Sequence, residues 1–156
     1  MNGKTNTCLA FLLILLCIST AAHSLVFEEH LIADTLPGWM DIYAIDLDGD
    51  GDIDVISTDM DSEEFEPNRG RVIWWENQNN GEFEPHIIAE ELHIVRGCHA
   101  VDIDEDGDID IFVADGDISW EHNEIIGNVY IFENDGEQEF DMQLITEDFP
   151  GAGELD

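Results

Sequence analysis

Two short runs of the sequence carry aspartate at alternate positions. The first, DLDGDGDIDV, occupies residues 46–55, and the second, DIDEDGDIDI, occupies residues 102–111. So many neighbouring carboxylates repel one another unless a cation lies between them. Hard cations such as Ca²⁺ take about six to eight oxygen ligands, mostly from carboxylates and carbonyls. The two runs therefore predict calcium chemistry, against the alternative of acidic turns that only stay hydrated.

The spacing within each run gives each oxygen a place around one ion. Side chains come from positions 1, 3, 5 and 9, a backbone carbonyl comes from position 7, and glycine at position 6 allows the sharp turn. We expect one Ca²⁺ per run, two in the chain. The predicted ligands of the first run are Asp46, Asp48, Asp50, the carbonyl of Asp52, and Asp54. Those of the second run are Asp102, Asp104, Asp106, the carbonyl of Asp108, and Asp110.

Other metal sites fit these residues less well. An EF-hand needs an acidic residue at position 12 and flanking helices, but position 12 is Ser57 in one run and Val113 in the other. Magnesium prefers a rigid octahedron with retained waters, which suits an all-carboxylate loop poorly. Transition metals favour imidazole. His30 and His86 recur at one repeat position, and we interpret them as packing residues.

The aspartate runs belong to a longer internal repeat. FEEHLIA begins at Phe27 and FEPHIIA begins at Phe83, each 19 residues before an aspartate run, and residues 72–83 resemble residues 129–140. The repeat predicts two full units and part of a third, at residues 27–82, 83–139 and 140–156. A third run would begin at position 159, so we expect this chain to be the N-terminal part of a longer protein or a truncated gene product, with a self-assembling partial propeller as the alternative.

Each unit contains four short segments rich in β-branched and aromatic residues, and no segment after residue 24 has helical periodicity. We predict an all-β fold of four-stranded antiparallel β-propeller blades, incomplete, with about two blades plus the start of a third. Cys98, Trp74 and Trp75 are predicted to pack in the core. The expected strands are residues 41–46, 52–58, 71–77, 82–89, 98–103, 108–114, 128–134 and 139–146.

The N-terminal segment predicts export. Lys4 precedes an apolar run at residues 8–20 and then small residues, so residues 1–24 are predicted to be a secretory signal peptide and residues 25–156 the repeat region. Lipid anchoring at Cys17 and an uncleaved membrane anchor are the alternatives. The 38 acidic side chains against 4 basic ones, a net charge of −34, argue against nucleic acid or anionic lipid as partners.

These motifs together resemble FG-GAP/VCBS repeats, the repeats of integrin α-subunit-like β-propellers. The resemblance rests on the two aspartate runs, the WWEN and IFEN strands that follow them, and the GEF and QEF segments beyond. It implies a bladed propeller with one calcium ion in the loop between the first two strands of a blade. The literal Phe-Gly and Gly-Ala-Pro signatures are missing, which places the chain nearer the VCBS type.

The expected function is that of a secreted or cell-surface calcium-binding scaffold that binds or adheres to a protein or glycan ligand. The alternative is a set of structural spacer blades within a larger secreted enzyme. No nucleophile elbow, cofactor motif or acid–base pair outside the runs indicates catalysis, so we do not expect an enzyme. We also expect further blades or domains in a full-length chain.

Overall fold

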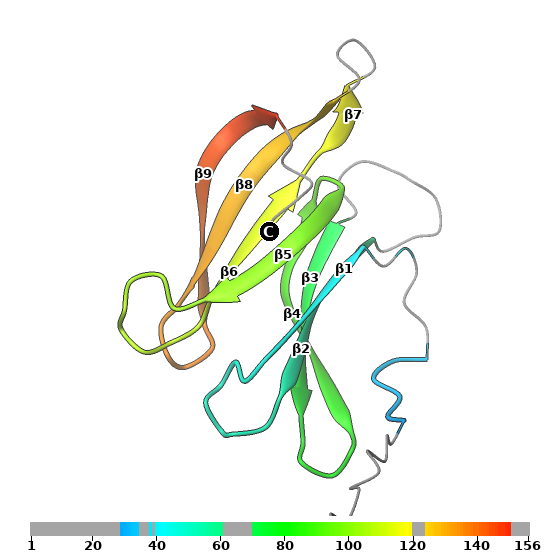
Figure 1. Cartoon of the computed structure of the whole chain (residues 1–156), viewed down its shortest axis with the longest axis vertical. Helices are drawn as coiled ribbons and strands as arrows, with labels where there is room; N and C mark the ends of the chain where they lie inside the picture. Colours follow the sequence, from blue (N-terminus) through cyan, green and yellow to red (C-terminus); the bar gives the residue numbers. More distant parts are fainter. Residues whose placement is uncertain (1–28, 35–37, 39, 61–69, 120–123, 151–156) are drawn as a thin grey trace, which may run out of the picture.

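The computed structural model describes residues 29–34, 38, 40–60, 70–119 and 124–150 (Figure 1). This part of the chain is all β, with nine strands and no helix. Consequently no helix within it is long and apolar enough to cross a membrane. The predicted signal peptide lies outside the described residues, as does residue 27, where the first repeat unit is predicted to begin.

The first sheet is an antiparallel meander in the order β1-β2-β3-β4. Its strands alternate apolar residues along their length, and directly opposed pairs such as Ile56 and Trp74 place apolar side chains together on one face. The strands are β1 (Asp41–Ile45), β2 (Asp54–Met60), β3 (Gly70–Asn77) and β4 (Phe83–Leu92).

The second sheet repeats this plan with one interruption. Its strands are β5 (Val95–Val101), β6 (Asp110–Asp115), β7 (Asp117–Ser119), β8 (Glu124–Asn134) and β9 (Phe140–Pro150). Both β6 and β7 pair with β8 in one register, since Ala114 is opposite Val129 and Asp117 is opposite Ile126. The two segments are therefore one strand broken at Gly116. At the break, a Cβ on Gly127 would overlap the carbonyl oxygen of Asp115, so β8 approaches too closely for any larger residue.

This arrangement confirms the predicted all-β fold class: the described residues form two antiparallel, blade-like sheets, each of four strands once β6 and β7 are counted as one broken strand. Each predicted strand is present, with its ends shifted by a few residues. The sheets are phased differently from the sequence units, because β4 and β9 begin at Phe83 and Phe140, the first residues of the next units. The segment from Phe140, predicted to open a third unit, pairs with β8 and completes the second sheet.

The core lies between the two sheets. The first sheet contributes Ile56, Val72 and Trp74, and the second packs Cys98, Ala100, Ile111, Val113 and Phe132 against them. Burial of Cys98, Trp74 and Trp75 is confirmed. Ile42, which corresponds to Cys98 in the repeat, is 64% exposed because it lies on the face of β1 turned away from the second sheet.

Each sheet also buries a carboxylate at one repeated position near the end of its second strand. In the first sheet Asp59 accepts two hydrogen bonds from the Arg71 guanidinium, at 2.8 Å from Nε and 2.6 Å from Nη2. In the second sheet Asp115 accepts from the backbone N–H of Asn128 at 2.8 Å and from the Tyr130 hydroxyl at 3.2 Å. Both carboxylates are satisfied, as burial requires.

Candidate functional site

The two aspartate runs form the β1–β2 and β5–β6 connections, and we name them the first Asp loop (residues 46–54) and the second Asp loop (residues 102–110). Both lie at the lower end of their sheets in Figure 1, each beside the hairpin turn that joins the last two strands of the same sheet. The glycine at position 6 has φ of 99° at Gly51 and 107° at Gly107. These angles lie in the region that glycine alone adopts readily.

The last aspartate of each loop ties the loop to its sheet. Asp54 accepts a hydrogen bond from the Leu47 N–H at 3.1 Å with one oxygen, and from the Asn77 N–H at 2.8 Å with the other. Asp110 does the same with Ile103 and Asn134, at 3.0 Å each. Each of these carboxylates is 1% exposed. The loop is thereby closed by the chain's own backbone donors.

The first aspartate of each loop has one oxygen in use and one without a partner. Asp46 accepts the Gly51 N–H at 3.0 Å through Oδ2, and Asp102 accepts the Gly107 N–H at 3.1 Å through Oδ2. The Oδ1 atom of each is buried and has no hydrogen-bond partner among the described residues. A buried carboxylate oxygen without a donor is costly. In each loop, this one buried oxygen without a donor marks a point where a cation would fit.

The middle aspartates fold the loops through short side-chain-to-backbone bonds. Asp48 accepts from the Asp50 N–H at 3.1 Å, and Asp50 accepts from the Asp52 N–H at 2.8 Å. The second loop repeats both bonds, at 3.2 Å to Asp104 and 3.0 Å to Asp106. Each bond uses one carboxylate oxygen, so the same residues keep a second oxygen for a ligand.

Only part of each predicted ligand set converges. Carboxylate oxygens of Asp46, Asp48 and Asp50 lie within 4.8 Å of one another, and so do those of Asp102, Asp104 and Asp110. The side chains of Asp54 in the first loop and Asp106 in the second stand outside these groups. Three carboxylates at this spacing suit a hard divalent cation. The full ligand sets, including the carbonyls of Asp52 and Asp108, stay predictions.

The electrostatics of the loops favour added positive charge. Desolvation raises the pKa of Asp48 above its ordinary value, and the negative charge of neighbouring carboxylates adds to the shift. Desolvation and nearby carboxylates likewise raise the pKa of Asp104 and of Asp108. A carboxyl group whose pKa is raised holds its negative charge unfavourably. A cation held among these side chains would remove that cost.

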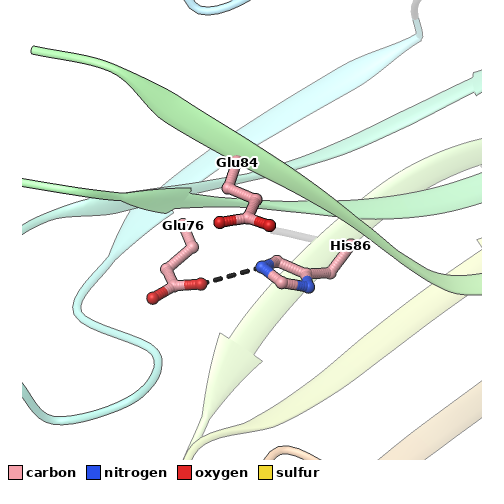
Figure 2. Close-up of side chains that lie close together, drawn as sticks. All are labelled: Glu76, Glu84 and His86. Atoms are coloured by element: carbon pink, nitrogen blue, oxygen red, sulfur yellow. Dashed lines mark hydrogen bonds and ion pairs between the residues drawn. The ribbon is translucent and has the colours of Figure 1, made fainter.

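A second polar cluster was not predicted from the sequence. Glu76 lies on β3, and Glu84 and His86 lie on β4, with ligand atoms of all three within 4.8 Å of one another (Figure 2). Nε2 of His86 lies 2.8 Å from Oε2 of Glu76, and its ring stacks on Trp74 at 4.6 Å between centroids. His86 thus packs, as predicted, but it also has a polar partner. His30 lies outside any strand.

Two similar four-stranded sheets, each with an acidic loop between its first two strands, define a class of repeat protein built from blade-like β units. Residues 46–113 match the family model of the FG-GAP-like repeat, so this part of the chain is similar to an FG-GAP-like repeat. Such repeats are typically non-catalytic structural modules. No curated protein and no solved structure shows significant similarity to this chain.

Proposed function

We propose that this chain is an exported calcium-binding module whose two Asp loops each hold one Ca²⁺. Asp46, Asp48 and Asp50 would hold the first ion, and Asp102, Asp104 and Asp110 would contribute to the second. Calcium would supply charge neutralisation to loops that contain no cationic side chain. The observation that carries the proposal is the buried oxygen without a partner at the first aspartate of both loops.

Calcium in these loops would stabilise the fold by linkage. Extracellular calcium modules bind with dissociation constants of about 10⁻⁴ to 10⁻³ M. At an ion concentration tenfold above the dissociation constant, each site adds about 1.4 kcal/mol to the free energy of unfolding. Two such sites would contribute about 3 kcal/mol, which is a large share of the 5–15 kcal/mol typical of a domain.

Calorimetric titration of the full chain with calcium tests this proposal. We expect about two ions per chain, and about one in the variants Asp46→Asn and Asp102→Asn. These substitutions remove the charge from the orphaned oxygen while leaving an amide oxygen for the glycine N–H. Asp141→Asn is the matched control, because Asp141 is exposed on β9 and lies outside both loops. No calcium uptake at millimolar ion, or equal uptake in all variants, would reject the proposal.

The role that we propose for the calcium-loaded blades is a scaffold, outside the cell or at its surface, that binds a protein or glycan ligand. Match to a typically non-catalytic repeat supports a scaffold over an enzyme. The two repeats differ most in residues 59–71 and 115–128, so we propose that ligand contacts come from these segments. Exchanging these two segments between the units should change ligand capture on a glycan or protein array while leaving calcium uptake intact. Unchanged capture would favour the spacer role.

A further inference from the structure

The Glu76, Glu84 and His86 side chains form one surface on the first sheet. Glu76 is directly opposite Glu84 across the β3–β4 pair, and His86 is two residues beyond Glu84 on the same face of β4. Figure 2 shows the two carboxylates and the imidazole turned toward a common point. Two carboxylates directly opposed across a strand pair repel each other. This part of the sheet is therefore organised around a position that a positive charge would stabilise.

The ligand chemistry differs from that of the Asp loops. The loops offer only oxygen, which suits calcium, whereas this cluster adds an imidazole nitrogen, which suits first-row transition metals and zinc. Two ligand atoms on one tetrahedral zinc ion lie roughly 3.3–3.6 Å apart, given zinc–ligand bonds of about 2.0–2.2 Å. The 2.8 Å between Nε2 of His86 and Oε2 of Glu76 is already close to that separation. The Glu84 carboxylate, with an oxygen within 4.8 Å of the other two ligand atoms, would have to move closer to reach the same ion.

Glu76 and His86 line a cleft between the sheets. This cleft has a volume of about 450 Å³ and is lined on the first sheet by Trp74, Glu76 and His86, at the first Asp loop by Asp48, and on the second sheet by residues 137–140. Three protein ligands leave one coordination position of a tetrahedral ion open. That position would be available to water or to a small ligand in the cleft.

Trp74, which lines this cleft, also carries an unsatisfied donor. Trp74 is 6% exposed, and its Nε1–H finds no acceptor among the described residues. A buried N–H without an acceptor is uncommon in folded proteins. An oxygen atom from a bound ligand would satisfy it. Stacking of His86 on Trp74 also fixes the imidazole plane, which limits the rotation that metal binding would otherwise have to restrict.

We propose that Glu76, Glu84 and His86 form a site for Zn²⁺ or a similar first-row divalent metal ion, separate from the Asp loops. The second sheet supplies a natural comparison at the equivalent positions, which are Glu133, Asp141 and Gln143. There Gln143 Nε2 donates to Glu133 Oε2 at 2.6 Å. The amide thus replaces the imidazole in the hydrogen bond but offers no comparable metal ligand. The first sheet has the site and the second does not.

The test is zinc titration of the full chain by calorimetry, in roughly 5 mM calcium so that any loop sites of the expected affinity are filled. We expect His86→Gln to lose one equivalent of zinc and to keep its calcium uptake. Mutating a residue that only hydrogen-bonds to a metal ligand typically lowers metal affinity by about 10–100-fold, so loss of a direct ligand should lower it by at least that much. The unfolding midpoint of His86→Gln without zinc should match that of the parent chain, because the second sheet tolerates glutamine at this position.

The converse variant sharpens the result. Gln143→His places an imidazole beside Glu133 and Asp141, and we expect it to add one equivalent of zinc. Zinc uptake that is equal in the parent chain and in His86→Gln would overturn the proposal. So would zinc that calcium displaces, because such zinc would lie in the Asp loops. The two proposals can fail separately, because His86→Gln changes no residue of the Asp loops.

Discussion

The first and second sheets share one backbone plan but treat their polar positions differently. Asp59 in the first sheet is neutralised by Arg71, whereas Asp115 in the second is held by the neutral donors of Asn128 and Tyr130. The difference extends to the cluster of Glu76, Glu84 and His86, because His86 in the first sheet corresponds to Gln143 in the second. The repeat therefore preserves where a polar group lies and varies how its charge is compensated.

The apolar positions differ for another reason. Ile42 and Cys98 occupy the same place on the first strand of each sheet, yet one is 64% exposed and the other 3%. The face that carries Cys98 packs on the first sheet, and the equivalent face of the first sheet does not pack on the second. Burial at a repeated position thus depends on whether that face of the sheet packs against another sheet. The residue type alone does not indicate it, because the exposed position also holds an apolar residue, Ile42.

The largest effect that we expect concerns thiol reactivity at this position. Desolvation, with Asp41 adding negative charge, raises the pKa of the Cys98 thiol to about 12. At pH 8 that shift alone lowers the thiolate fraction about a thousandfold relative to an ordinary cysteine. Alkylation followed by peptide mass spectrometry should therefore be slow at Cys98 and fast at an Ile42→Cys substitution. Comparable rates at the two positions would contradict the burial difference.

The same pKa shift has a defined effect on stability. The folded state holds the Cys98 proton more tightly than the unfolded state does. The contribution of this protonated thiol to the free energy of unfolding is therefore complete below pH 9, the ordinary thiol pKa, and is lost as pH rises toward about 12. A Cys98→Ala variant should lack this component of the alkaline decline, which urea unfolding at several pH values would measure.

A smaller effect concerns the two buried carboxylates, Asp59 and Asp115, whose partners should differ in how much they stabilise the fold. Arg71→Met leaves the fully buried Asp59 without its charged partner and should cost about 3 kcal/mol, as expected when one member of a buried ion pair is removed. Asn128→Ala should cost only about 1 kcal/mol, because the backbone N–H of residue 128 still donates to Asp115. Urea unfolding at fixed calcium measures both. Equal costs would show that the charge of Arg71 is not what stabilises Asp59.

The smallest expected effect is at Tyr130. Its hydroxyl donates to Asp115 at 3.2 Å and accepts from Asn128 at 3.1 Å, so Tyr130→Phe should cost about 1 kcal/mol at neutral pH. Desolvation and the charge of Asp115 raise the pKa of Tyr130 above 10. The folded state therefore keeps this proton longer, and stability falls as pH rises beyond about 10 in the parent chain. The difference in free energy of unfolding between the parent chain and Tyr130→Phe should therefore shrink above about pH 10. A difference that stays constant up to about pH 11 would contradict this.

The strands could be predicted because alternation and β-branched residues are local signals. The start of β2 was predicted at residue 52, whereas it begins at Asp54. The error arises because Asp54 belongs to both the loop and the strand. Its role in closing the loop also depends on the N–H of Asn77, which is 23 residues away. Residues that act through such distant partners are not identified by spacing within a motif.

The His86 cluster escaped prediction for a similar reason. Glu84 and His86 are close in sequence, but Glu76 joins them only through the register that places it opposite Glu84. The alternating pattern predicts two strands without fixing that register. The repeat does carry a usable signal, since the equivalent positions hold Glu133, Asp141 and Gln143. Comparing the two units position by position would have marked residue 86 as the one that changes chemistry.

The hydrogen bonds of Asp54 and Asp110 also bear on the speed of ion exchange. Both carboxylates tie their loops to the sheets through backbone donors of the chain itself. A loop that is already folded pays little ordering entropy when an ion arrives. On the calcium proposal, capture would then be limited by encounter and dehydration of the ion, and the residence time would set the affinity. Such loops would follow fluctuations in the surrounding ion concentration without waiting for the chain to refold.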